Sequence, residues 1–149
     1  MSKHYRLVMI PAILLIIFGV FSGFSNSSEE ETVEGLIRER TSILQQTYFG
    51  KMTKEQAETR LQEIEIYPLY NKDIYQFDQF KNTEIDRVRG MKIKEIWENT
   101  NLYDYKAFKC KIQWEMRGVE GNYTTLGLYH LVLKKDRGIY KLSEFELKK

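Results

Sequence analysis

The sequence is poor in residues that cross-link or break a chain: it has one cysteine, Cys110, and two prolines, Pro11 and Pro68, among 149 residues. A single cysteine cannot form an intrachain disulfide, so a disulfide-stabilised scaffold is excluded. Cys110 stands in an apolar alternation with Phe108 and Ile112, which predicts a small buried side chain rather than a nucleophilic thiolate. The scarcity of proline excludes a long proline-rich linker.

Catalytic and metal-binding signatures are also missing. His130 is the only histidine beyond the N-terminal segment, so the usual sets of metal ligands lack a second imidazole. The G-x-S-x-G pattern and the glycine-rich phosphate loop are both absent. We interpret Asp73 and Asp78 as capping or solvated residues, because Asp73 falls in the first turn of an expected helix. The sequence therefore predicts no cofactor and no metal, and leaves His130 as the candidate for a pocket residue.

Acidic and basic residues nearly balance. The chain has 23 Lys and Arg against 21 Asp and Glu, and the surplus of two is supplied by Lys3 and Arg6 in the N-terminal segment. Because nucleic-acid binding needs a concentrated basic face, a neutral domain argues against DNA or RNA as a partner. With 42% hydrophobic and 30% charged residues, the composition is typical of a folded globular protein.

An apolar run, Leu7–Phe24, follows Lys3 and Arg6 near the N-terminus. At about 1.5 Å per residue, a helix of this length spans roughly 27 Å, close to the hydrocarbon thickness of a membrane. The basic residues before the run should stay in the cytoplasm, which sends the rest of the chain across the membrane. We predict a signal anchor or a cleaved signal peptide in residues 1–24, a linker in residues 25–28 and an extracytoplasmic domain in residues 29–149.

Helical signals fill the first half of this domain. Ser28 with Glu31, and Thr53 with Gln56, have the spacing of a capping box. Pro68 should end the region, because the residue before a proline avoids the α conformation. The expected helices run from the first box to about Tyr48, where Gly50 is a plausible stop, from Thr53 to about Ile64, and from about Lys72 to Lys81 with Asn71 as the cap.

Strand signals replace them after about residue 85. Phe108, Cys110, Ile112 and Trp114 alternate with polar residues, which is the pattern of a half-buried strand. The expected strands are Ile85–Trp97 with a possible bulge at Gly90, Tyr103–Arg117, Tyr123–Lys135 and Ile139–Leu147, with Glu98–Asn101 as a turn. Short links between successive strands imply antiparallel pairing, so we predict an α+β fold of three helices and a curled four-stranded sheet.

This order of elements resembles the NTF2-like, or cystatin-like, superfamily over residues 29–147. The resemblance rests on the long helix Val33–Tyr48, the helix that starts at Thr53, and the curled strands that carry Trp97 and Trp114. It implies a cone-shaped pocket, in which an enzyme of the superfamily would need a general base. The superfamily also includes non-enzymatic, membrane-anchored assembly proteins of the VirB8 type from bacterial secretion and conjugation machines. A single anchor followed by such a domain is similar to that group in organisation.

Aromatic residues are the candidates for a binding surface, because tyrosine offers a large contact area at low entropic cost. The candidate residues are Tyr67, Tyr70, Tyr75, Phe77, Tyr103 and Tyr105. We expect a non-enzymatic binding domain, tethered to a bacterial-type cell membrane, that meets other envelope proteins or a second copy of itself. Two alternatives stay open: a small-ligand-binding protein or isomerase- or dehydratase-like pocket enzyme with His130 or an aspartate as base, and a secreted effector or inhibitor released by signal cleavage.

Overall fold

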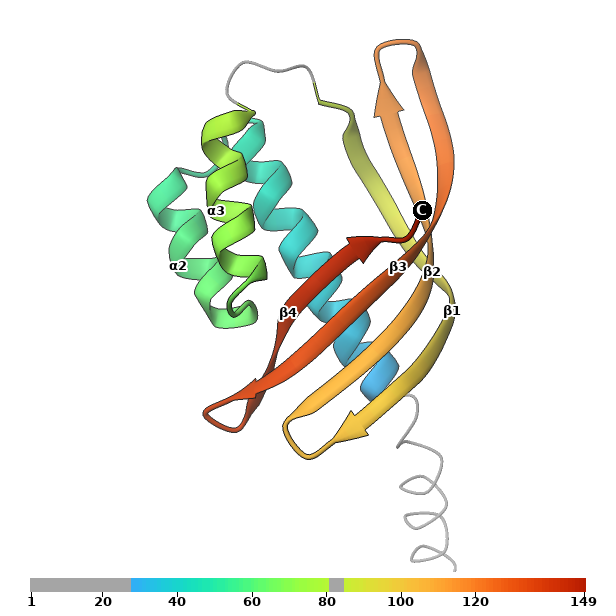
Figure 1. Ribbon diagram of the computed structural model, residues 1–149. Coiled ribbons are helices and arrows are strands. Elements are labelled where there is room, and N and C mark those ends of the chain that lie inside the picture. Colours follow the sequence, from blue (N-terminus) through green and yellow to red (C-terminus); the bar gives the residue numbers. More distant parts are fainter. Residues whose placement is uncertain (1–27, 81–84) are drawn as a thin grey trace, which may run out of the picture. The chain divides into compact units, whose positions relative to one another are not determined.

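The computed structural model describes residues 28–80 and 85–149 of the chain (Figure 1). The predicted membrane segment, residues 1–24, and most of the predicted linker lie outside these ranges. Within the two described ranges, no helix is both long enough and apolar enough to cross a membrane. The chain divides into two compact units, Met1–Glu34 and Gly35–Lys149, and the second unit contains the sheet.

The first described helix covers residues 28–48 and ends where the sequence predicts. Gly50 follows it at φ +69°, the left-handed conformation that commonly closes a helix. The expected capping box of Ser28 and Glu31 was wrong as a start signal. Ser28 is itself helical, and its carbonyl accepts a hydrogen bond of 2.7 Å from Thr32 Oγ1. A residue inside the helix cannot act as its N-cap, which needs a non-helical backbone.

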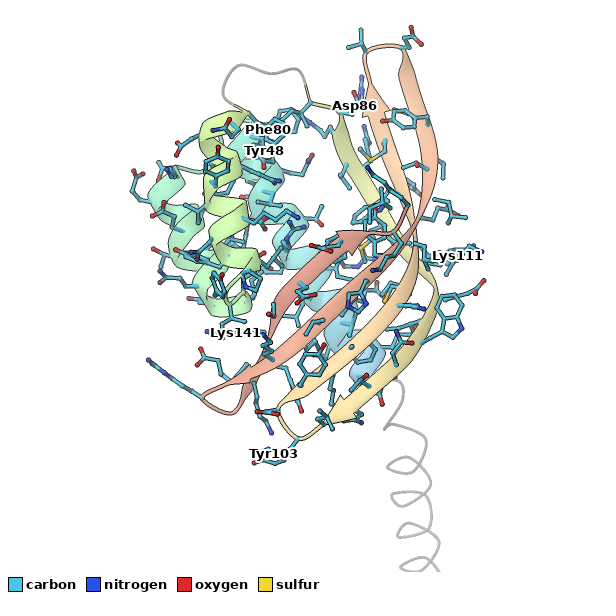
Figure 2. All side chains as sticks on the ribbon, in the orientation of Figure 1. Tyr48, Phe80, Asp86, Tyr103, Lys111 and Lys141 are labelled. Carbon is cyan, nitrogen blue, oxygen red and sulfur yellow. The ribbon has the colours of Figure 1, made fainter. Side chains whose placement is uncertain are left out.

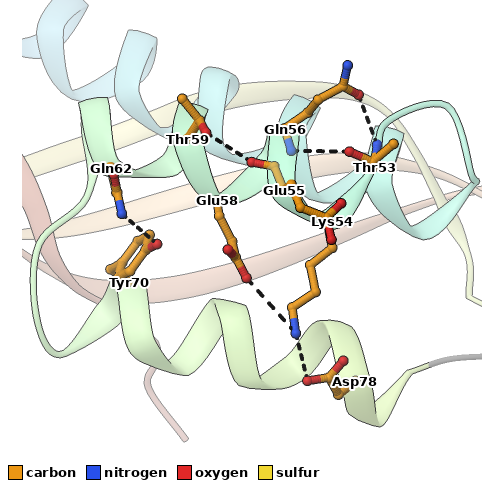
Figure 3. A network of polar contacts seen from close by, with 9 residues as sticks. All are labelled: Thr53, Lys54, Glu55, Gln56, Glu58, Thr59, Gln62, Tyr70 and Asp78. Atoms are coloured by element: carbon orange, nitrogen blue, oxygen red, sulfur yellow. Dashed lines mark hydrogen bonds and ion pairs between the residues drawn. The ribbon is translucent and has the colours of Figure 1, made fainter.

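Helix α2, Lys54–Ile64, starts at the predicted capping box (Figure 3). Thr53 Oγ1 accepts the Gln56 N–H at 3.2 Å, and Gln56 Oε1 accepts the Thr53 N–H at 3.0 Å. Each side chain therefore satisfies a backbone donor that the first turn leaves without a helical partner. Ala57 and Leu61 lie on the buried side of the helix.

Helix α3, Leu69–Gln79, begins earlier than expected. Its N-cap is Pro68, and Asn71, the predicted cap, lies inside the helix. Proline lacks an N–H group, and the first turn of a helix has no acceptor for that group, so Pro68 loses nothing by preceding α3. Pro68 was interpreted correctly as a signal that the preceding helical segment ends. Its role as the N-cap of the next helix, α3, was missed.

Four strands follow and form one antiparallel sheet in the order β1-β2-β3-β4 (Figure 1). They are β1 Arg87–Leu102, β2 Tyr105–Gly118, β3 Gly121–Asp136 and β4 Ile139–Leu147. The predicted meander is confirmed. The expected turn at Glu98–Asn101 was wrong, because these residues belong to β1 and the chain turns at Tyr103 and Asp104. The pairing of β1 with β2 shifts register between Glu98 and Thr100, and the strand continues through this shift.

The period-two pattern of β2 identified correctly which side chains point into the core. Cys110, Ile112 and Trp114 are buried, whereas Lys109 and Glu115 are exposed. The helices cover the buried face of the sheet and leave the other face open (Figure 1). The architecture is therefore an α+β domain with helices on one side of a four-stranded antiparallel sheet.

The second half of the first described helix is held directly to the sheet. Gln45 Oε1 accepts the backbone N–H of Val88 at 2.9 Å, and Arg38 Nη2 donates to the carbonyl of Met91 at 2.7 Å. On its other side this helix contributes to a cluster of buried apolar residues shared with α2 and α3. The cluster consists of Ile43, Leu44, Ala57, Leu61 and Phe77. These contacts hold the helix as a middle layer, with the pair α2 and α3 on one side and the sheet on the other.

Candidate functional site

A hollow of about 280 Å³ lies between the first described helix and the sheet, and it opens to solvent. We call it the aromatic hollow. Its lining residues come from the last turns of the helix, from β1 and β2, and from the facing parts of β3 and β4: Arg40, Thr41, Leu44, Gln45, Tyr48, Val88, Trp114, Met116, Thr125, Tyr129 and Phe145.

Three aromatic side chains form one wall of the hollow. Trp114 Nε1 donates a 2.9 Å hydrogen bond to Tyr129 Oη, and the two rings meet edge to face. The Tyr129 ring stacks on Phe145 with centroids 4.8 Å apart. A Cβ atom at Gly127 would lie 2.6 Å from the Tyr129 ring, so the glycine makes room for this arrangement. The interlocked rings give the hollow a firm, mainly apolar wall.

A cluster of charged groups, Arg40, Glu65 and Asp73, lies at one end of the hollow. Arg40 binds Asp73 through two hydrogen bonds of 2.7 Å, from Nε to Oδ2 and from Nη2 to Oδ1. Arg40 Nε also lies 3.0 Å from Glu65 Oε1, and the side chains of both acids are fully buried. The guanidinium stands 5.2 Å from the centre of the Phe145 ring, which joins the charge cluster to the aromatic wall.

The two carboxyl groups of this cluster lie against one cation, and the surroundings of Glu65 favour its protonated form. Burial and the negative charge of Asp73 raise the pKa of Glu65 from its ordinary value to about 9, against the opposing effect of Arg40. Burial lowers the pKa of Arg40, but its ion pairs with Asp73 and Glu65 outweigh burial and raise it. Neither oxygen of Glu65 accepts a hydrogen bond from the described residues. At neutral pH the cluster is therefore a single Arg40–Asp73 ion pair beside a neutral Glu65 carboxyl group.

The charge cluster joins segments that are distant in sequence. Arg40 lies in the first described helix, Glu65 directly follows α2, and Asp73 lies in α3. Next to Glu65, the backbone N–H of Ile66 donates to the carbonyl of Leu142 in β4 at 2.9 Å. We conclude that the cluster fixes the helices and the sheet around the hollow, and that it is a structural part of the site.

A second cavity, of about 420 Å³, adjoins the hollow at the far end of the first described helix, and Tyr48 lines both. We call it the arginine groove. Its lining residues are Tyr48, Phe49, Ile85, Asp86, Arg87, Arg89, Arg117, Gly118 and Val119. Tyr48 and Asp86 lie at the same end of the domain, while Tyr103 lies at the opposite end (Figure 2). The hollow and the groove therefore form neighbouring compartments, one aromatic and one basic.

The residues of the predicted aromatic surface differ in exposure. Tyr67 and Tyr75, at α3 and the turn before it, are 70% and 65% exposed, but Phe77 on the same helix is buried and its ring meets Tyr48 edge to face. Tyr70 is half-buried, and its hydroxyl accepts a hydrogen bond from Gln62. Phe77 therefore belongs to the core rather than to a surface, and the exposed residues Tyr75 in α3 and Tyr67 in the turn before it remain predicted contacts.

The other predicted aromatic residues lie at the turn between β1 and β2. Tyr103 is 85% exposed, and Lys135 Nζ stands 4.4 Å from the centre of its ring. Tyr105 is half-buried in the first position of β2. The Tyr103 carbonyl accepts a hydrogen bond from Tyr140, and the Tyr67 carbonyl accepts one from Ser143, so both residues contact β4. Their role in binding stays a prediction.

His130 lies in β3, away from both cavities. It is not among the residues that line the aromatic hollow or the arginine groove. Its Nε2 atom is 3.8 Å from Glu144 Oε2 in the neighbouring strand, and its side chain is 22% exposed. The alternation that places His130 with Leu128 and Val132 therefore directs it to the sheet face opposite the hollow.

The sequence interpretation missed the charge cluster. Asp73 was expected to be a solvated capping residue, but it is fully buried and paired with Arg40. Arg40 and Glu65 were not singled out, because charged residues on amphipathic helices usually face solvent. Their pairing depends on how three helical segments pack, and no local sequence pattern in any of the three segments predicts it. The sequence interpretation did not single out the arginines of the groove as a site either.

No protein-family model matches this chain, and a search of curated proteins found no match. Among solved structures, the chain is similar to the intermembrane-space region of the chloroplast protein ARC6. The TM-score is 0.50 at 10% sequence identity, and the match covers 78% of this chain and 94% of the other. At this identity the likeness shows the fold alone, helices with an antiparallel sheet, and it carries no residue of the site from one protein to the other.

Proposed function

We propose that this protein is a membrane-tethered, extracytoplasmic binding domain that holds a protein partner in a cell-envelope assembly, and that the aromatic hollow receives an apolar side chain of that partner. The observation that carries the proposal is the composition of the hollow. Trp114, Tyr129 and Phe145 give it an aromatic wall, and aromatic residues are enriched in the energetically dominant parts of protein interfaces.

The size of the hollow supports a protein partner over a small molecule. Pockets for small ligands usually have volumes of about 300–1,000 Å³ and enclose most of the ligand. A cavity of about 280 Å³ that opens to solvent fits one or two side chains projecting from a larger body. The likeness to the intermembrane-space region of the chloroplast protein ARC6 concerns the fold alone, so the proposal depends on the hollow itself.

The chemistry of the lining also supports binding over catalysis. General acid–base chemistry most often uses an imidazole or a carboxylate, and also a thiol, an amine or a phenol, that reaches the substrate. The phenols in the hollow are Tyr48 and Tyr129, and the Tyr129 hydroxyl already accepts a hydrogen bond from Trp114. The described residues that line the hollow include no aspartate, glutamate, histidine or cysteine. Its one charged residue, Arg40, is held by Asp73 through two hydrogen bonds, which leaves it positioned as a structural cation.

Site-specific photo-cross-linking in the native cells tests the proposal. A benzophenone amino acid replaces Thr125, which lines the hollow, in the full chain; the control replaces Lys109, an exposed residue of β2. We expect illumination to join a defined envelope protein to the Thr125 variant and not to the Lys109 variant. Absence of any product from Thr125, or equal products from both positions, would show that the hollow is not a partner site.

A further inference from the structure

Three arginines converge on the arginine groove from two paired strands. Arg87 and Arg117 are register partners in β1 and β2, so they stand directly opposite each other. Arg89 lies at the register shift between Val88 and Gly90, and it lines the same groove. Like charges placed directly opposite each other in a sheet are unfavourable. The arrangement therefore needs a reason beyond the stability of the β1–β2 pair.

Charge within the groove is not balanced by its own residues. Its only described acid is Asp86, against Arg87, Arg89 and Arg117. The Asp86 carboxylate already accepts a hydrogen bond from the Tyr123 hydroxyl. Among the described residues, none forms an ion pair with any of the three arginines. The groove thus presents an excess of two positive charges with guanidinium groups available to a ligand.

The groove is shaped by close contacts and is not a loose collection of side chains. The Arg87 guanidinium lies 4.3 Å from the centre of the Phe49 ring, which orients its plane. A Cβ atom at Gly118 would lie 3.0 Å from Asp86 Oδ1, so the glycine allows this acid to approach the end of β2. A stacked guanidinium keeps its edge free for planar, bidentate recognition of a carboxylate.

We propose that the arginine groove binds an acidic segment of the protein partner, with Asp or Glu carboxylates on Arg87, Arg89 and Arg117. This inference rests on the proposed function, because Tyr48 lines both the groove and the aromatic hollow. A single segment can place an apolar side chain in the hollow and its acidic residues in the neighbouring groove. The partner segment is therefore expected to combine an apolar anchor with two or more nearby carboxylates.

Fluorescence anisotropy with the full chain in a non-ionic detergent tests the proposal. The probe is a labelled peptide of alternating leucine and glutamate, and the control peptide has glutamine in place of glutamate. We expect the glutamate peptide to bind at least about tenfold more tightly, since a hydrogen bond to a charged group contributes enough for one such factor. We expect Arg117→Gln to weaken the glutamate peptide by about tenfold and to leave the glutamine peptide unchanged.

Two further variants separate a binding effect from a folding effect. Arg137→Gln removes the same charge at the exposed β3–β4 turn, outside the groove, and should bind within about twofold of the wild type. Arg117→Glu places an acid opposite Arg87, so it should raise the unfolding temperature while it abolishes peptide binding. Equal weakening by Arg137→Gln and Arg117→Gln would overturn the proposal, because it would mean that net charge alone is sensed.

Other outcomes distinguish the two proposals. If the Thr125 cross-link forms equally well in wild type and Arg117→Gln, and the peptide binds both equally, the acidic-segment inference fails and the proposed function stands. If no cross-link forms from Thr125 in the wild type, the proposed function fails. Binding of vesicles containing phosphatidylglycerol that depends on Arg117, with no peptide binding, would overturn the inference in favour of a lipid ligand.

Discussion

The fully buried carboxyl group of Glu65 shows how one residue couples the stability of this protein to pH. The folded protein holds a proton on Glu65 up to a pKa of about 9, whereas an exposed glutamate releases its proton near pH 4.3. Between these values the folded state binds more protons than the unfolded chain. The free energy of unfolding therefore falls as pH rises, and the contribution of this proton is fully present below about pH 4.3 and lost by about pH 9.

We predict that Glu65→Gln removes this dependence. Glutamine keeps the size of the carboxylic acid and carries no charge at any pH, so the variant should match the protonated form. Between about pH 6 and about pH 9 the wild type should lose stability more steeply than the variant, by up to about 1.4 kcal/mol per pH unit. Urea unfolding followed by circular dichroism at several pH values measures both slopes.

Glu63→Gln is the matched control for that prediction. Glu63 lies two residues before Glu65, in the last turn of α2, but is exposed, so its substitution should leave the pH dependence of the wild type intact. Parallel curves for the wild type and Glu65→Gln across the whole range would contradict the prediction. They would show that Glu65 is already ionised in the folded protein at neutral pH.

At the scale of single elements, the start of α2 gives a local test. The Thr53 side chain caps the helix (Figure 3). The helix carries the buried residues Ala57 and Leu61. We predict that Thr53→Ala lowers the free energy of unfolding by about 1 kcal/mol, because a donor of the first turn loses its acceptor. The midpoint of urea unfolding reports the loss, with the slope of the transition unchanged.

Thr59→Ala provides the comparison within the same helix. Thr59 is exposed, and its hydroxyl donates to the Glu55 carbonyl one turn earlier, without a capping role. Alanine has a higher helix propensity than threonine, so this change should be neutral or slightly stabilising. A loss as large for Thr59→Ala as for Thr53→Ala would remove the capping argument.

Elements could be predicted from the sequence where their signals are local. The capping box at Thr53 and the alternation around Cys110 each lie within a few residues, and both were interpreted correctly. The start of α3 was missed because Asn71 is a common cap in isolation, whereas Pro68, whose missing N–H group has no helical partner to lose, takes the N-cap position. The length of β1 was missed because a strand can pass through the polar stretch Glu98–Asn101 when β2 supplies its partners.

The site could not be predicted in the same way. Arg40, Glu65 and Asp73 meet only after three helical segments have packed, and each looks like an ordinary solvated residue in its own segment. The groove depends on the strand register that places Arg87 opposite Arg117, and no sequence pattern predicts that register. Residue identity predicted the layers of the fold, whereas the contacts between layers decided where charge is buried and where it gathers.

At the scale of the whole molecule, the predicted anchor should make the full chain and a chain that begins at Ser28 behave differently in membrane extraction. We predict that the full chain stays with the membrane during alkaline carbonate extraction, because the apolar run Leu7–Phe24 is long enough to span it. A chain that begins at Ser28 should appear in the supernatant and unfold in one cooperative transition, since the buried core residues lie between Val33 and Leu142. Membrane fractions and supernatants are compared by immunoblot.

The size of the native protein gives the control for that experiment. If the full chain is found in the supernatant with its mass reduced by the N-terminal segment, the anchor is a cleaved signal peptide and the secreted alternative gains support. If the shortened chain also stays with the membrane, a surface of the domain itself binds there. Intact-mass analysis of both fractions separates these results.

The reactivity of Cys110 toward a thiol reagent can report how often the sheet opens. It is the only cysteine of the chain, its side chain is fully buried, and it lies in β2 between Ile96 of β1 and Tyr129 of β3. A thiol reagent can reach the sulfur only when this central part of the sheet separates, so each modification event records one passage through an open state. A partner that binds only the closed sheet would lower the rate of Cys110 modification in proportion to its occupancy. The protein itself would need no added label.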